Sequence, residues 1–511
     1  MLALRESALE RILVIDVGTS SLKAIVYDTT GCMLNRASEE YHSEFLADGR
    51  VEQDPLTWQH ALLATLQQTR EWLRAGNLNL EAIAVTSQRA SVIPIGDDGR
   101  PLRSAIMWQD KRSRPHCAKL LERLSLKEMY ARTGLRVDPY FSAPKMMWLR
   151  DECPEMYAAS TKLLGVQDYI VYLLTGRYVT DWTQACRTML MNIAGFRWDD
   201  DMLAATGIAP SKLPELCPPG AMVGTLRQEI ARPAGLPSGI PVIVAGGDQQ
   251  CAALALNVLA AGDAEANTGT GSFIVAYSEK PQWEDECRTL CSAAAVAGRW
   301  IVEAGIFNTG SVHRWFREQF YPKEKDAYAL MNREAAESPV GANGVLMLSH
   351  FGGSAAPYWN PGAKGVFFNL SLGVRRGDLA RAILEGIALE IAHNLSLIEP
   401  MVNGISRVSV AGGLVAFDLF NQIQADAFRK TVVRYDNPEA SSLGALMSAA
   451  VELGICRDHR EAFRAVYPAE PIVFRPDAAN ATKYAALFER KGRLYEALAR
   501  HHVYDSFTDP V

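Results

Sequence analysis

The 511-residue sequence lacks long apolar runs and long basic runs. No stretch reaches the ~18 apolar residues that a membrane-spanning helix requires, so we expect no membrane as a partner. The net charge is −6, and the densest basic cluster, Lys111–Arg114, holds only three cations. A nucleic-acid groove needs a basic face, so the sequence also predicts no nucleic-acid partner.

Paired cysteine spacing is lacking as well. Nine cysteines are scattered along the chain, and the nearest two, Cys287 and Cys291, have no second Cys or His pair at zinc-site spacing. An odd number of unpaired thiols is typical of a reducing compartment, so we expect free cysteines and a cytoplasmic location. Charged residues at Arg5, Glu6 and Glu10 precede any apolar run, and we therefore expect no signal peptide.

A polar turn near the amino terminus carries the first chemical signal. Two runs rich in β-branched residues, 12–17 and 22–28, flank it and predict a β-hairpin. Gly18 permits the positive φ angle that a sharp turn often needs. Hydroxyl and backbone N–H groups in such a turn form a concave site for an anion. The candidate phosphate-binding residues are Thr19, Ser20, Ser21 and Lys23, and Asp16 is the candidate Mg²⁺ ligand. An ordinary hairpin is the alternative interpretation.

A second copy of this pattern lies about half-way along the chain. The segment 267–277 again places a turn of Gly, Thr and Ser before a strand, with Thr270 and Gly271 in the turn. Two phosphate-type turns, each opening a half-chain, predict a duplicated α/β fold with a nucleotide held between the halves.

The third signal is an aspartate at the end of a buried strand. Val242–Ala245 predicts the strand, and two glycines then let the backbone approach a ligand closely. Asp248 follows them, with Gln249 beside it. A strand-end Asp after glycines is usually a turn residue. Because two phosphate-type turns occur in the same chain, we favour a catalytic role for Asp248.

These segments resemble the FGGY family of carbohydrate kinases, within the actin-like ATPase superfamily. Residues 140–149 fit the first family signature at each fixed position. Residues 378–385 fit only the later part of the second signature, because Asn369 and Ser371 depart from its opening. The resemblance runs from about Ile12 to Gly454. It implies two actin-like (ribonuclease H-like) α/β domains with a cleft between them: residues 1–256, with the acceptor site and the first turn, and residues 257–511, with the nucleotide site and the second turn.

The resemblance also implies an activity and residue roles. The expected reaction transfers the ATP γ-phosphoryl group, with Mg²⁺, to a primary hydroxyl of a small ketose or polyol. Asp248 would act as general base, and the implied acceptor-binding residues are Arg89, Tyr140, Asp248 and Gln249. Gly310, Arg314 and Gly413 would lie beside the nucleotide, although the glycerol-kinase branch carries Gln where Arg314 stands. The halves would close about the segment 252–262, and family resemblance suggests a homodimer or larger homo-oligomer.

The acceptor is less clearly specified. In the glycerol-kinase branch Glu follows the Arg that corresponds to Arg89, whereas this chain has Ala90. Its small side chain removes a partner for hydroxyls and leaves room for extra carbons, so xylulose is the first choice and glycerol the alternative. Two other classes remain open: a chaperone-like or filament ATPase of the same superfamily, and a sugar sensor without turnover.

Three long helices are expected outside these motifs: 56–75, 378–398 and 441–454. Ser441 or Ser442 would cap the last of them, and Gly454 would end it. Residues beyond about Pro471 are expected to form a peripheral helix and a tail.

Overall fold

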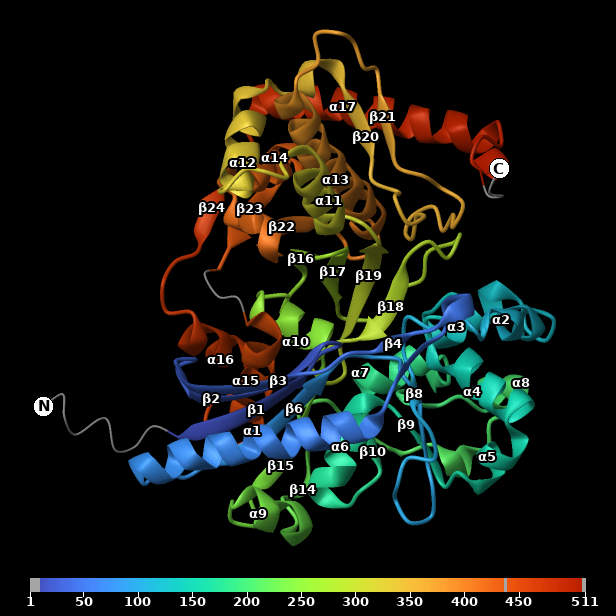
Figure 1. Ribbon diagram of the computed structural model, residues 1–511, viewed down its shortest axis with the longest axis vertical. Helices are drawn as coiled ribbons and strands as arrows, with labels where there is room; N and C mark the ends of the chain where they lie inside the picture. Colours follow the sequence, from blue (N-terminus) through green and yellow to red (C-terminus); the bar gives the residue numbers. More distant parts are fainter. Residues whose placement is uncertain (1–9, 436–438, 508–511) are drawn as a thin grey trace, which may run out of the picture.

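The computed structural model describes residues 10–435 and 439–507, and two large mixed sheets dominate it (Figure 1). The first sheet has six strands, in the order β14 (Met222–Thr225), β15 (Pro241–Gly247), β6 (Ala82–Ser87), β1 (Arg11–Val17), β2 (Ser21–Asp28) and β3 (Met33–Glu40). The second has seven, in the order β18 (Leu290–Ala293), β19 (Trp300–Ile306), β17 (Ser272–Ser278), β16 (Gly262–Thr268), β22 (Ile405–Ala411), β23 (Thr431–Arg434) and β24 (Ile472–Phe474).

The two sheets share one topology. β1, β2 and β3 form an antiparallel meander, and so do β16, β17 and β19. β6 joins β1 in parallel, as β22 joins β16, and β15 and β23 extend the two parallel sets. The duplicated α/β fold expected from the two polar turns is therefore confirmed. The division between 256 and 257 falls in the connection before β16 and stays a prediction.

The inner strands of the first sheet, β15, β6, β1 and β2, are buried on both faces, which explains their apolar sequences. Leu13 and Ile15 pack toward α1 (Pro55–Gly76), α6 (Val166–Thr175) and α9 (Gln228–Ala234). Ile12 and Val14, one residue out of phase, pack toward α10 (Asp248–Ala255), α15 (Ala440–Glu452) and α16 (His459–Val466). Figure 1 shows α10, α15 and α16 between the two sheets.

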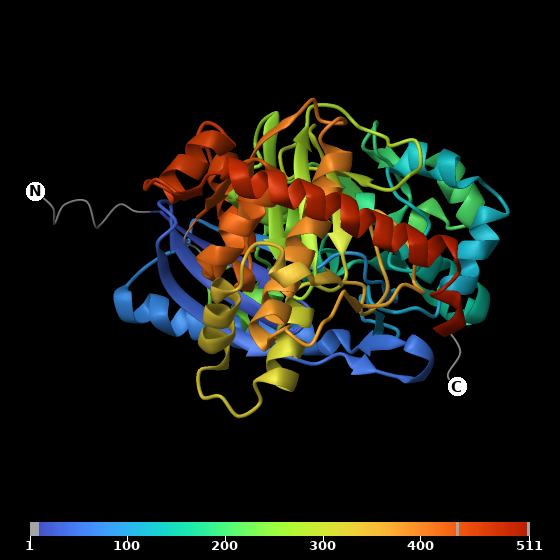
Figure 2. The same cartoon turned by 90° about the horizontal axis from the view of Figure 1, so that it is seen from above.

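The second sheet is covered on its outer face by α11 (Gly310–Phe320), α12 (Ala327–Glu337), α13 (Arg376–Ile398), α14 (Asp418–Phe428) and α17 (Ala478–Arg500). α17 crosses this layer in Figure 2. It is less peripheral than expected, because it buries Lys491 against Glu390 of α13 and Tyr484 against Glu385, with a hydrogen bond of 2.9 Å in the second pair.

α10 and α15 occupy equivalent places in the two halves, after β15 and after β23, and they pack against each other. A Cβ atom at Gly444 of α15 would lie 1.9 Å from the carbonyl oxygen of Cys251 in α10. Glycine therefore sets the distance between these helices. The predicted cap is wrong: Glu439 is the N-cap of α15, and Ser442 instead donates to Asp16 at 3.4 Å.

Smaller elements build a lobe on the first half, at the lower right of Figure 1. Its helices are α2 (Arg114–Leu121), α3 (Leu126–Thr133), α4 (Ser142–Glu152), α5 (Pro154–Ala159), α7 (Trp182–Ala185) and α8 (Asp200–Thr206). Its short strands include β7 (Ile93–Ile95), β8 (Ala105–Ile106), β9 (Lys162–Leu164) and β10 (Val179–Asp181). All nine cysteines are free thiols. Among the described residues no helix is long and apolar enough to span a membrane.

Candidate active site

Three parallel strands of the first sheet end at the same level. Val17 of β1 and Gly247 of β15 are both in register with Ser87 of β6. The carboxyl ends of adjacent parallel strands are where α/β proteins collect ligands. Asp16, Arg89 and Asp248, chosen from three separate motifs, are thereby brought to one sheet edge.

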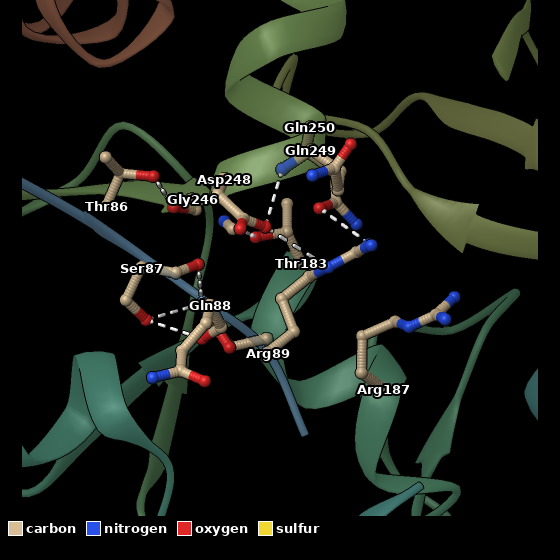
Figure 3. A network of polar contacts seen from close by, with 12 residues as sticks. Thr86, Ser87, Gln88, Arg89, Thr183, Arg187, Gly246, Asp248, Gln249 and Gln250 are labelled. Atoms are coloured by element: carbon tan, nitrogen blue, oxygen red, sulfur yellow. Dashed lines mark hydrogen bonds and ion pairs between the residues drawn. The ribbon is translucent and has the colours of Figure 1, made fainter. Parts of the chain in front are cut away.

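Arg89 lies at the centre of a buried polar network (Figure 3). Its Nε is 3.6 Å from Asp248 Oδ1, and its Nη1 donates to Gln250 Oε1 at 3.1 Å. A Cβ atom at Gly247 would lie 2.6 Å from Cδ of Arg89, so this glycine makes room for the aliphatic part of the arginine side chain. Burial raises the pKa of Asp248 above its ordinary value, and the charge of Arg89 opposes that rise. A carboxylate of this kind is suited to accept a proton.

Gln249 follows Asp248 at the start of α10 and offers an unused acceptor. Its backbone N–H donates to Asp248 Oδ1 at 2.8 Å. Its side-chain Oε1 is buried and has no hydrogen-bond partner among the described residues. Buried polar atoms are nearly always paired, so an orphan beside a candidate base marks a place for a ligand.

An aromatic wall joins the first polar turn to the acceptor region. Trp108 Nε1 donates to Thr19 Oγ1 at 3.2 Å, and the Trp108 ring meets the Tyr140 ring edge-on at 5.5 Å. Lys145 of α4 fixes the loop that carries Tyr140, because its Nζ donates to the carbonyl oxygens of residues 139, 140 and 141 at 2.7, 2.6 and 3.1 Å. The lysine of the first signature therefore holds the aromatic residue in place.

Two charged residues that sequence reasoning missed complete this region. Arg187 lies over the rings of Tyr140 and Phe141, 5.5 and 5.0 Å from their centroids, and it pairs with Glu303 of β19 at 3.0 Å. The same carboxylate reaches Arg89 at 3.4 Å. A signal was present, since Glu303 interrupts an apolar strand and a buried charge requires a partner. Which arginines pair with Glu303 depends on contacts between the two halves, and a local sequence pattern cannot predict such contacts.

The region around Ala90 differs from the sequence-based expectation. Ala90 is buried with φ of 68°, a left-handed conformation that is uncommon for alanine. It lines an enclosed cavity of about 20 Å³, together with Asp168 and Gln184. That is space for about one water molecule rather than for extra carbons. This cavity therefore does not supply the additional room that Ala90 led us to expect.

The first polar turn has the predicted hairpin, but Gly18 is not among the residues with positive φ. Its N–H closes the turn on the Ser21 carbonyl at 2.9 Å. Asp16 and Lys23 are cross-strand neighbours, and Lys23 pairs with Glu439 at 2.7 Å. Burial, opposed by Lys23, raises the pKa of Asp16 to about 6. Thr19 is half-buried and Ser20 is exposed, so both hydroxyls remain within reach of a ligand.

The second polar turn opens on a pocket of about 480 Å³. The pocket is bounded by the ends of β16 and β22 and by α11, and four predicted nucleotide-binding residues line it: Thr270, Gly310, Arg314 and Gly413. A Cβ atom at Gly413 would meet no atom within 4 Å, so bare backbone faces the open space. Gly271 does not line the pocket, because its Cα packs against the carbonyl of Ile306, 2.4 Å from where a Cβ would lie.

Comparison with known proteins identifies the class. Residues 11–255 match the FGGY family of carbohydrate kinases, N-terminal domain, and residues 264–453 match its C-terminal domain. The chain therefore belongs to the FGGY family of carbohydrate kinases, which are phosphotransferases.

Its relatives within the family differ in the acceptor named for them. The chain is 33% identical to a glycerol kinase of Ralstonia nicotianae, over 92% of this chain and 96% of that one. It is 30% identical to a gluconokinase of Bacillus licheniformis, over 84% and 85%. Among solved structures, the xylulose kinase of Rhodospirillum rubrum is 28% identical with a TM-score of 0.90, covering 97% of this chain and 100% of that chain.

Proposed function

We propose that this protein transfers the γ-phosphoryl group of ATP to a primary hydroxyl of a small neutral ketose or polyol. The observation that carries the proposal is the position of Asp248, a partly exposed carboxylate held 3.6 Å from Arg89 at the shared end of three parallel strands. The pocket at the second turn supports the nucleotide half of the reaction, since it offers bare glycine backbone and Arg314.

The proposed chemistry assigns the proton to Asp248. Its carboxylate accepts the proton of the acceptor hydroxyl while the new O–P bond forms and the bond to the ADP oxygen breaks. Arg89, Tyr140 and Gln249 hold the acceptor. The hydroxyls of Thr19, Ser20 and Ser21, with Lys23, face the phosphates from one half, and the turn at Thr270 and Gly271 holds them from the other. Closure of the halves about the segment 252–262 would exclude water.

Asp16 fits a Mg²⁺ ion as a single ligand. The described residues contain no group of three or more His, Cys, Asp or Glu side chains that would hold a metal alone. Mg²⁺ needs no such group when phosphates and water complete its shell. Asp16 is buried with a pKa raised to about 6, so a cation beside it would favour its charged form. When bound, Mg²⁺ neutralises charge on the transferred phosphoryl group.

Xylulose is the first acceptor that we propose, because Ala90 stands in place of the Glu of the glycerol-kinase branch. Glycerol is the second candidate, and two observations favour it. Glu303 brings a carboxylate to Arg89 from the other half, and a glycerol kinase is 33% identical over most of the chain. We further propose a cytoplasmic enzyme that works as a homodimer or larger homo-oligomer.

A coupled ADP-release assay over glycerol, erythritol, xylulose, ribulose and gluconate tests the proposal. We expect ATP turnover to depend on one of the neutral acceptors. Turnover that is independent of every acceptor would favour the chaperone-like or filament ATPase. Acceptor binding without turnover would favour the sugar sensor.

A further inference from the structure

Glu303 belongs to the second half of the molecule, yet both of its polar contacts with guanidinium groups are to the first half. Its Oε1 lies 3.0 Å from Arg187 Nη1, and its Oε2 lies 3.4 Å from Arg89 Nη1. All three side chains are about 3% exposed. Although burial pushes the pKa of Glu303 upward, Arg187 and Arg89 outweigh it and hold that pKa below its ordinary value. The carboxylate is therefore charged.

The charges around the candidate base then balance. Two cations, Arg89 and Arg187, are matched by two anions, Glu303 and Asp248. Glu265 lies in the same cross-strand row of the sheet, since it pairs with Val275 of β17, which pairs with Glu303. Both of its carboxyl oxygens are buried without a hydrogen-bond partner among the described residues. Burial, and next the charge of Glu303, raise the pKa of Glu265 well above its ordinary value, which favours its neutral form.

We infer that Glu303 is a specificity-determining residue that restricts the acceptor to uncharged polyols and ketoses, by neutralising the two guanidinium groups beside Asp248. This inference rests on the proposed function. Two free guanidiniums would bind a sugar-acid carboxylate in a bidentate manner. With Glu303 between them, an anionic acceptor would bring an unmatched negative charge into a buried site.

The test uses pairs of acceptors that differ by one carboxylate: glycerol and glycerate, xylitol and xylonate, glucitol and gluconate. The quantity measured is the ratio of kcat/KM for the acid to that for its neutral partner. Wild-type protein should favour the neutral member of each pair. Glu303→Gln, which leaves one unmatched positive charge, should move the ratio toward the acid by about tenfold or more.

Three further variants separate charge from packing. Glu265→Gln makes the same change of side chain in the same cross-strand row, two strands away on β16, where burial favours the neutral acid, so its ratio should stay close to that of wild type. Glu303→Asp keeps the charge on a shorter side chain and should keep the ratio while turnover falls. The double variant Glu303→Gln with Arg187→Gln restores the balance, and its ratio should return toward that of wild type, which a purely structural role does not predict.

A Glu303→Gln protein that folds and keeps the wild-type ratio overturns the inference, and so does a wild-type protein that prefers the acids. If Glu303→Gln does not fold, Arg187→Gln alone carries the test, because its extra negative charge should move the ratio further from the acid. An unchanged ratio in Arg187→Gln would also overturn the inference. Absence of turnover with every acceptor contradicts the proposed function instead.

Discussion

Arg89 Nε lies 3.6 Å from Asp248 Oδ1, and the two residues follow β6 and β15, strands that are distant in the sequence but adjacent in the sheet. At this distance the guanidinium stabilises the carboxylate electrostatically, but the two atoms are too far apart for a direct hydrogen bond. The Asp248 carboxylate thus remains available to an acceptor hydroxyl.

Replacing Asp248 by Asn tests the assignment of the base. The amide cannot accept the proton, so kcat should fall by about 10²–10⁴-fold. Nucleotide affinity should change little, because Asp248 does not line the pocket at the second turn. The measurements are ADP release and nucleotide titration, with Asp98→Asn on an exposed turn as a control. A near-normal kcat in Asp248→Asn would contradict the assignment of Asp248 as the general base.

The dependence of activity on pH follows from the same pair. Because burial raises the pKa of Asp248, kcat/KM should fall on the acid side at a pH above the ordinary aspartate pKa of about 3.9. Arg89→Gln removes the charge that opposes this rise, so the pKa increases and the acid limb should move to higher pH. Arg457→Gln, a change at an exposed ion pair, should leave the profile unchanged. An acid limb that moves to lower pH in Arg89→Gln contradicts the argument.

The two polar turns should both contribute to ATP affinity. Thr19→Val and Thr270→Val each remove a hydroxyl from a charged ligand, a loss of roughly 1.5–3 kcal/mol. Calorimetric titration with ATP should show weaker binding in both, with less change in acceptor affinity. Trp108→Phe is the control for Thr19, because it removes the indole donor and leaves the hydroxyl. If only one of the two valine variants weakens ATP binding, a clamp formed by both halves is wrong.

Ala90→Glu tests the choice between xylulose and glycerol. A restored carboxylate beside Arg89 should lower the ratio of kcat/KM for xylulose to that for glycerol. Ala90→Gln, of equal size and without charge, should have a smaller effect. The cavity beside Ala90 is about 20 Å³, so both variants should also lose thermal stability. If the wild-type protein prefers glycerol, or if the xylulose-to-glycerol ratio does not fall in Ala90→Glu, glycerol becomes the favoured acceptor.

The contact between α10 and α15 should tolerate no added methyl group. Gly444→Ala places a Cβ atom against the Cys251 carbonyl, and we expect a loss of about 1–3 kcal/mol in the free energy of unfolding. Gly492→Ala is the matched control in α17, since a Cβ atom there meets nothing within 4 Å. Helix propensity predicts a gain of about 0.5–1 kcal/mol for it. Equal melting temperatures for the two variants would contradict the packing argument.

The sequence predicted the duplication because the two polar turns repeat the same local pattern, and local patterns depend on neighbouring residues alone. It likewise placed α1, α13 and the strand before Asp248 within a few residues. It failed at Ser442, whose hydroxyl donates to Asp16 instead of capping α15. The error at Ser442 has a long-range cause, because its hydroxyl contacts a residue at the other end of the chain.

In the candidate site, too, local sequence patterns predict some residues, whereas long-range contacts determine others. Residues at strand ends, such as Asp248 and Arg89, follow from strand and turn signals. Arg187 and Glu303 do not, because their pairing joins residues 116 positions apart in opposite halves. The small cavity at Ala90 also required the structure, since sequence gives the size of one side chain but not of the space around it.

Because α15 lies near the end of the chain, the first sheet cannot be fully covered until late in translation. One apolar face of the first sheet is completed by α15 and α16, which are encoded near the end of the chain. About 190 residues separate α10 from α15, and at roughly 5–20 residues per second their synthesis takes roughly 10–40 seconds. During that interval the face with Ile12 and Val14 is only partly covered. A nascent chain paused in this region would therefore present an aggregation-prone surface until translation passes Val466, the end of α16.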